Sequence, residues 1–228
     1  MGNTTAVGLC NTDDMNVVHA MFRHLLGRAV PLVREVRPGD RDRAAIVVAH
    51  VREIAHGLHD HHSTEDTLLW DDLAARAPAC ALHVGLMRSQ HATVADQLAA
   101  LEDPLTQLER TASAAARDDA AEALDRVRGT LEEHLGAEEE QILPWVRTTF
   151  TQEEWDVLGE AGRSKIPKER MFVQLGHMMA PMSDDEARAW TRANLPLPAR
   201  LMYLLVGRRQ YLAELRTLYP EGCPPDAR

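Results

Sequence analysis

The sequence predicts an all-α protein: an antiparallel four-helix bundle followed by a C-terminal helical extension. Ala, Leu, Arg and Glu, which favour helices, dominate the chain. Alternation of apolar and polar residues is rare, and β-branched residues are sparse outside residues 46–51. Apolar residues at helical spacing form long stretches divided by Pro and Gly, and four such stretches with short connections are typical of a bundle.

Proline and glycine mark where the helices of the bundle should end. Pro38 and Gly39 close the first helix, and Pro78 closes the second. Pro104 marks a kink or a restart after the third helix, and Pro144 should distort the last turn of the fourth. The predicted helices cover approximately residues 11–36, 41–77, 80–103 and 118–150.

The chain changes character after residue 150. Thr151 with Glu154, and Ser183 with Glu186, have the spacing of a capping box, so shorter helices should begin there. Pro167, Pro181, Pro196 and Pro198 interrupt this part. We therefore expect two units, a bundle at residues 12–150 and a helical extension at residues 151–228 that packs on the bundle and covers its open side.

Composition limits the classes of function. The longest apolar runs are shorter than the ~20 residues that a membrane span requires, and the first residues resemble no export signal. A net charge of −10 without a basic block argues against nucleic acid or an anionic membrane as a partner. The scattered Cys10, Cys80 and Cys223 indicate reduced thiols and a cytoplasmic protein.

Histidine and glutamate occur in a repeated arrangement. His61 precedes Glu65 by four residues, and His134 precedes Glu138 by four. On a helix this spacing places both side chains of a pair on one face. His19 lies 42 residues before His61, and His91 lies 43 residues before His134, so the chain has two similar halves. Each predicted helix of the bundle thus carries at least one candidate ligand.

Helix lengths place these side chains at a common depth. Nineteen residues separate His19 from Pro38, and twenty-one separate Asp40 from His61. At ~1.5 Å per residue, the chain returns to the level at which it started. Buried imidazoles and carboxylates are costly unless they bind a cation, so the arrangement predicts a metal site. Its six or seven ligands suit two ions, the nitrogen-rich set suits iron, and the lack of Cys argues against structural zinc.

The stretches VVHAMFR, HHSTEDTLLW, SQHATV and HLGAEEEQILP resemble the hemerythrin-like, or HHE cation-binding, domain over residues 12–150. The resemblance implies a four-helix bundle with an oxo- or hydroxo-bridged di-iron centre, in which the two glutamates bridge. The classical oxygen carrier has a His-x3-His pair on its third helix, whereas Met87 and Ala95 flank His91 here. His62 is a candidate replacement, because the eukaryotic iron-sensing F-box relative has a ligand at the matching place. The expected ligands are His19, His61, His62, Glu65, His91, His134 and Glu138.

The remaining polar residues have simpler interpretations. His62 is a ligand, an orienting group or a solvated residue, and Arg23 is an orienting group or part of a surface ion pair. The EEE run at residues 138–140 is expected to be one ligand followed by solvated charge. We expect six other histidines to be structural or exposed: His24, His50, His56, His59, His83 and His177.

Three functions fit such a centre. The first is a module that senses or stores O2, NO or peroxide. The second is a di-iron enzyme that decomposes peroxide or oxidises a small organic substrate, which the missing imidazole and the long extension favour. The third is a bundle whose metal is chiefly structural. The access of protons and electrons to the ligand pocket separates the first two, and the sequence leaves that access and the oligomeric state open.

Overall fold

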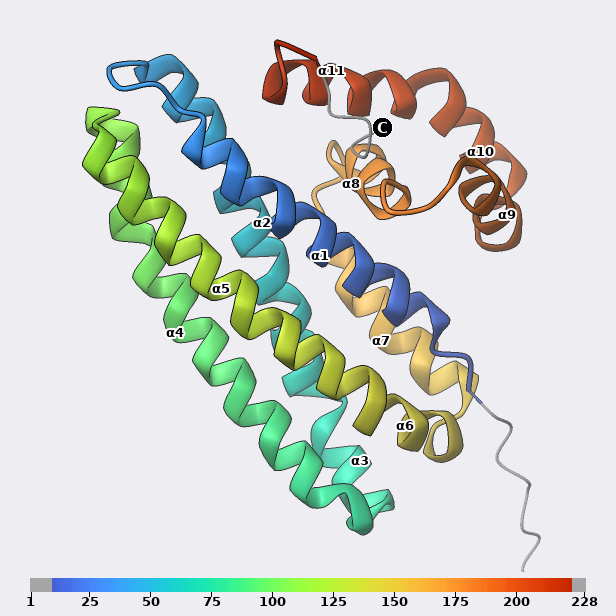
Figure 1. Cartoon of the computed structure of the whole chain (residues 1–228). Helices are drawn as coiled ribbons and strands as arrows, with labels where there is room; N and C mark the ends of the chain where they lie inside the picture. Colours follow the sequence, from blue (N-terminus) through green and yellow to red (C-terminus); the bar gives the residue numbers. More distant parts are fainter. Residues whose placement is uncertain (1–9, 223–228) are drawn as a thin grey trace, which may run out of the picture.

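The computed structural model describes residues 10–222, in which helices joined by short connections occur and no strand does, so the all-α prediction is confirmed there. Its long helices are α1 (Asp13–Arg34), α2 (Arg41–Leu68), α4 (Ala81–Thr111) and α5 (Ala114–Gln141). They lie side by side and alternate in direction along the chain (Figure 1). α1 packs on α2 and α5, and α4 packs on the same two helices from the other side.

Two predicted helices are interrupted where we expected continuity. α2 ends at Leu68, and α3 (Trp70–Arg76) and the 3-10 turn η1 (Pro78–Cys80) follow it. α5 ends at Gln141, and α6 (Leu143–Thr149) follows. The junction residues Leu69 and Ile142 have nearly the same backbone angles, φ −109° and −110° with ψ −50° and −53°. Both side chains are fully buried. Each break therefore allows the apolar side chain at the junction to reach the core.

Proline acts differently from the prediction at two places. Pro104 lies inside α4, which continues to Thr111, so there is no restart. Pro144 stands in the first turn of α6, where its missing N–H removes no helical hydrogen bond. The fourth long helix begins at Ala114, before the expected residue 118, because the Ser113 side chain caps it by accepting from the amide of Ala116.

The core consists of two apolar clusters with a polar layer between them. On α1, Met15 belongs to one cluster and Phe22 to the other, with His19 between them. On α4, Met87 and Val94 flank His91 in the same way. α2 and α5 repeat the pattern, since Leu58 and Leu69 enclose the histidines and the glutamate of α2, and Leu131 and Ile142 enclose those of α5. Apolar packing above and below thus fixes the depth of this layer.

The rest of the chain packs on the α1–α2 side of these helices (Figure 1). It comprises α7 (Gln152–Ser164), α8 (Met171–Met179), α9 (Asp184–Asn194), α10 (Leu197–Met202), the π-helix η2 (Tyr203–Gly207) and α11 (Arg208–Leu218). Both predicted capping boxes are present, at the starts of α7 and α9. α7 contacts α2, and α8 contacts α1.

Cys10 and Cys80 are buried free thiols, and burial raises the pKa of Cys10 to about 11. Cys223 lies outside the described residues. Residues 1–9 do as well, so the prediction that the first residues are no export signal is not tested. In residues 10–222, every helix is too short or too polar to cross a membrane.

Candidate metal centre

The seven residues predicted as ligands form one layer inside the long helices. Six are buried, and the His61 side chain is 13% exposed. We call this set the central layer: His19 from α1, His61, His62 and Glu65 from α2, His91 from α4, and His134 and Glu138 from α5.

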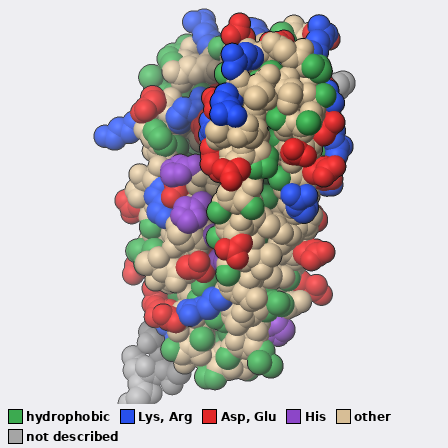
Figure 2. Space-filling view, turned by 90° about the vertical axis from the view of Figure 1, so that its left-hand side faces the viewer, with side chains coloured by type: hydrophobic (Ala, Val, Ile, Leu, Met, Phe, Trp, Pro, Cys, Tyr) green, Lys and Arg blue, Asp and Glu red, His purple; other side chains and the backbone are tan. Residues whose placement is uncertain are grey.

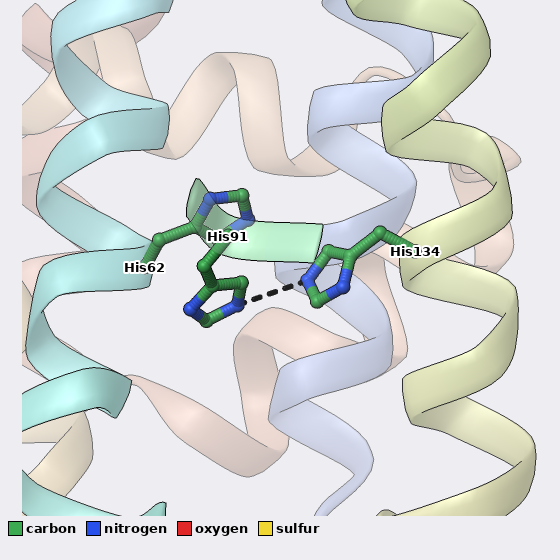
Figure 3. A group of neighbouring side chains, drawn as sticks. All are labelled: His62, His91 and His134. Carbon is green, nitrogen blue, oxygen red and sulfur yellow. Dashed lines mark hydrogen bonds between the residues drawn. The ribbon is translucent and has the colours of Figure 1, made fainter. Parts of the chain in front are cut away.

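One side of the central layer is a triad of imidazoles. His62, His91 and His134 point toward one another from α2, α4 and α5 (Figure 3). The rings of His62 and His91 stack with centroids 4.1 Å apart, and Nε2 of His91 lies 3.1 Å from Nε2 of His134. His62, which the sequence left open, is therefore neither solvated nor remote from the other rings.

The other side brings together His19, His61 and Glu65. Two carboxylates connect the sides. Glu65 has one oxygen 3.4 Å from Nε2 of His61 and the other 3.6 Å from Nε2 of His91. Glu138 has one oxygen 3.4 Å from Nε2 of His19 and 3.6 Å from Nε2 of His134. Each carboxylate thus faces one imidazole from each side, as a bridging group must.

Polar side chains around the central layer fix the rings. Nδ1 of His19 lies 2.9 Å from a carboxylate oxygen of Glu139, and Nδ1 of His91 lies 2.8 Å from Asp66. Nδ1 of His134 lies 3.2 Å from the side-chain oxygen of Gln90. Because a carboxylate oxygen only accepts, Nδ1 of His19 and His91 carries the hydrogen, and in a neutral ring Nε2 then offers a lone pair to the interior.

Sequence reasoning missed Asp66, Gln90 and Glu139. The interpretation of the EEE run as one ligand plus solvated charge is wrong for Glu139, which holds His19 and also accepts from Arg23 at 2.6 Å. A signal was present, because the acidic residues Asp66 and Glu139 each directly follow a bridging-type glutamate, at equivalent places in the two halves. Each of them orients the one central-layer histidine of another helix.

Unpartnered atoms concentrate in the central layer. Seven of the ten buried side-chain nitrogen and oxygen atoms without a hydrogen-bond partner, within the described residues, belong to it. They are Nε2 of His19, His61 and His62 and both oxygens of Glu65 and Glu138. With the Gln90 oxygen accepting from His134, two further lone pairs face each other between His91 and His134. Buried acceptors without donors are costly, so this donor set fits a cation.

The pKa values agree with that interpretation. Burial lowers the pKa of His61 to about 3 and that of His134 to about 4, and it lowers that of His62 strongly, so their lone pairs are free at neutral pH. Burial opposes the charge on His19, but Glu138 and Glu139 outweigh it and raise its pKa to about 9. Burial and the charge of Glu138 raise the pKa of Glu65 well above its ordinary value. Without a cation, protons must therefore take part in balancing the two carboxylates.

A cavity of about 60 Å³ adjoins the imidazole triad. His62 and His91 form its inner wall, and His59, Ser63, Asp66, Ala95 and Leu98 complete it. A single water requires roughly 10–15 Å³ of such volume, so the cavity has room for a few small molecules.

His59 is exposed at the outer wall of this cavity, and four other histidines have partners elsewhere. His56 is paired with Asp60, and His83 with Gln141. His50 and His177 are buried beside each other between α2 and α8, with ring centroids 5.9 Å apart. Histidine side chains also reach the molecular surface among acidic ones (Figure 2). These placements agree with the expected structural or exposed roles.

A helical fold that encloses a layer of imidazoles and carboxylates defines a class of cation-binding helical proteins. The family model described as the hemerythrin HHE cation binding domain matches residues 10–151, which is more than half of the chain. The chain therefore belongs to the hemerythrin HHE family, and the predicted resemblance is confirmed. Searches of curated proteins and of solved structures gave no match.

Proposed function

We propose that the chain is a non-heme di-iron protein that binds O2, NO or peroxide as a sensor or storage module. The observation that carries the proposal is the set of seven unpartnered atoms in the central layer. The family supports cation binding, and a mixture of imidazole and carboxylate favours iron over magnesium or calcium.

In this proposal the long helices act as the antiparallel four-helix bundle of the family. Residues 12–150 form that domain, and residues 151–228 form the helical extension. Reduced thiols and the absence of a crossing helix within residues 10–222 are compatible with a cytoplasmic protein.

The seven residues divide between two ions. His62, His91 and His134 would hold one ion, and His19 and His61 would hold the other. Glu65 and Glu138 would bridge the two, since each faces an imidazole of either side. His62 takes the place of the imidazole that Met87 and Ala95 do not supply.

The bound pair would supply electrons and open coordination positions to a small oxidant or to NO. The protein's own contribution is orientation and exclusion of water. Asp66, Glu139 and Gln90 hold Nδ1 of three rings so that Nε2 faces inward. The apolar clusters on either side keep water from reaching the carboxylates along the bundle axis.

The size of the adjoining cavity supports a small ligand. At about 60 Å³ it has room for molecules of a few heavy atoms, such as O2, NO or hydrogen peroxide.

A second candidate is an enzyme that decomposes peroxide. The specific observation that favours it is the polar outer wall of the cavity, which His59, Ser63 and Asp66 form and in which His59 and Asp66 are exposed to solvent. Protons that reach a bound peroxide promote cleavage of its O–O bond, whereas a dry pocket holds it reversibly.

Iron loading separates these functions. Anaerobic addition of Fe(II) should give about two iron ions per chain, the number suited to two bridging carboxylates. A persistent, reversible charge-transfer band on exposure to O2 indicates a sensor or store, and rapid bleaching with peroxide turnover indicates the enzyme. A large fall in Tm on chelation without any optical response indicates a structural metal. Iron content far below two, with no band, would refute both di-iron functions.

Matched variants test the ligand assignment. His61→Ala should remove one iron or both, because it deletes a group of the central layer. His59→Ala, two residues earlier on α2, should keep the full iron content. Equal losses in the two variants would contradict the assignment.

A further inference from the structure

An apolar surface lies exposed at the beginning of the chain's last helical segment, which runs from Leu197 to Leu218. From Leu197 to Gly207, only Tyr203 and Gly207 are buried. Six large apolar side chains there are between 39% and 63% exposed: Leu197, Leu201, Met202, Leu204, Leu205 and Val206. We call these six the apolar tip. Contiguous exposed apolar patches mark interaction sites, whereas single exposed apolar residues do not.

The apolar tip is held in place by a narrow seam on its inner side. The ring of Tyr203 lies 6.4 Å from that of Phe172 on α8. A Cβ atom on Gly207 would lie 2.8 Å from Cβ of Phe172, so the helix approaches α8 as closely as a glycine permits. The π-helical turn that contains both residues places them on one side, and the apolar tip faces outward around them.

Charge around the apolar tip is opposite to that of the whole protein. The chain has a net charge of −10, yet residues 187–213 contain five arginines and no Asp, Glu or Lys. Asp184, Asp185 and Glu186 directly precede this stretch, and Asp185 pairs with Arg188 at 2.6 Å, so residues 184–213 carry five arginines against three acidic residues. Arg192, Arg208 and Arg209 are exposed. This basic segment belongs to the part of the molecule farthest from α4 and α5 (Figure 1). At the screening length of about 8 Å in physiological salt, distant acidic groups do not cancel its attraction for an anion.

We propose that the apolar tip, with its flanking arginines, docks the protein on the surface of an anionic lipid membrane. Helices that lie in a membrane interface combine apolar side chains that enter the acyl boundary with arginine or lysine at the headgroups. A second copy of the chain fits less well, because a symmetric contact would place the two arginine sets against each other. Since no described helix can cross a membrane, the association is peripheral.

The proposal revises the inference from overall charge. The value of −10 argues against an anionic membrane only if the charge is spread evenly, and it is not. The acidic remainder would help to orient the protein, since it is repelled by the same surface that attracts the arginines.

Vesicle co-sedimentation of the full chain tests the proposal. The protein should sediment with vesicles of phosphatidylcholine and phosphatidylglycerol, and at least ~tenfold less with phosphatidylcholine alone. Raising the salt concentration should weaken binding, because screening weakens the attraction of the arginines. Equal binding to both kinds of vesicle, or to neither, would overturn the proposal.

Variants of exposed residues locate the contact. Leu204→Glu/Leu205→Glu should reduce binding to anionic vesicles by at least ~tenfold, because it removes two inserting side chains and adds repulsion. Leu82→Glu is the control, since Leu82 is 89% exposed and lies on α4. Arg208→Ser/Arg209→Ser, which leaves the apolar tip intact, should also weaken binding and reduce its salt dependence. Helical circular dichroism and an unchanged Tm establish that each variant is folded.

Two results would overturn the assignment. One is equal loss of vesicle binding in the Leu82 control and the Leu204/Leu205 variant. The other is a dimer in light scattering that the Leu204/Leu205 variant dissociates while vesicle binding is unchanged; a second copy would then cover the apolar tip. Because the readout is lipid binding, the outcome is independent of whether the central layer holds iron.

Discussion

Two polar clusters in this protein, one buried and one partly buried, use the same kinds of side chain and differ in how those side chains are satisfied. In the central layer, seven nitrogen and oxygen atoms have no hydrogen-bond partner. The second cluster, which we call the interface network, joins α2 to α8 and α11 and comprises Glu53, Arg170, Gln174, His177 and Glu214.

The interface network is closed. Arg170 donates to both oxygens of Glu53 at 2.6 and 2.7 Å, and it pairs with Glu214 at 2.5 Å. His177 holds the other oxygen of Glu214 at 2.8 Å. The comparison teaches that burial of histidine and glutamate does not by itself identify a ligand site. Missing partners do, because a satisfied network stabilises a contact while an unsatisfied one requires an ion.

The largest expected effect is on iron binding in the central layer. Glu65→Gln should weaken iron binding by more than ~100-fold, a larger loss than removal of an orienting partner causes. Burial and the charge of Glu138 raise the pKa of Glu65 well above its ordinary value, so the iron-free protein loses little charge, and its free energy of unfolding should stay the same or rise by about 1 kcal/mol. Iron content and urea unfolding of the iron-free protein measure the two effects. A strongly destabilised iron-free variant would mean that Glu65 serves the fold.

The matching change in the interface network should have the opposite signature. Glu214→Gln leaves Arg170 and His177 with a poorer partner, so the free energy of unfolding should fall by about 3 kcal/mol. Iron content should not change, because the nearest contacts of Glu214 are outside the central layer. Loss of iron in this variant would show that the two clusters are coupled.

Acid should weaken the contact between α2 and α8 by protonating His50, which lies beside His177 of the interface network. Burial, with His177 beside it, lowers the pKa of His50 to about 4, below the ordinary 6.5. The unfolded chain therefore takes up a proton at a higher pH than the folded one, and stability falls as pH drops from 6.5 toward 4. At pH 5 this residue should cost about 2 kcal/mol relative to neutral pH.

His50→Gln tests this pH dependence in the iron-free protein. Between pH 7 and pH 5, the free energy of unfolding should fall by ~2 kcal/mol less in this variant than in the original chain. Glu214 acts in the same direction at lower pH. Burial raises the pKa of its carboxyl group, but His177 and Arg170 outweigh burial and lower this pKa to about 2. His59→Gln, an exposed change on the same helix, should leave the slope unaltered. An unchanged slope in His50→Gln would exclude His50 as its source.

Much of the fold was predictable because the sequence marks helix ends by chemistry. Pro38, Pro78 and the capping boxes at Thr151 and Ser183 delimit helices through local effects. The break at Leu69 was not predictable from propensity, since leucine interrupts no helix, whereas Pro144 predicted a distortion close to the break at Ile142. Both breaks follow from burial of the junction side chain in the core, and the similar sequences around the two junctions were the only indication of this.

The central layer was predictable for a related reason. His61 with Glu65, and His134 with Glu138, share a helix face by spacing alone, and helix lengths set their depth. The orienting residues Gln90 and Glu139 contact rings on other helices, so their roles depend on how the helices are rotated against each other. No spacing along one helix encodes that rotation. The apolar tip escaped notice because an overall charge conceals a local one.

The smallest expected effect concerns the residues that orient the rings. Asp66→Asn keeps the shape but offers His91 a weaker acceptor, so iron affinity should fall by about tenfold. The same substitution next to the other bridging-type glutamate, Glu139→Gln, should act equally on His19, because the two acidic residues occupy equivalent places. Glu140→Gln is the control, since Glu140 is exposed and follows directly. Competition with a chelator of known affinity measures the iron affinity of all three variants. If Glu140→Gln weakens iron binding as much as Glu139→Gln, then Glu139 acts through its negative charge near the site and not by orienting His19.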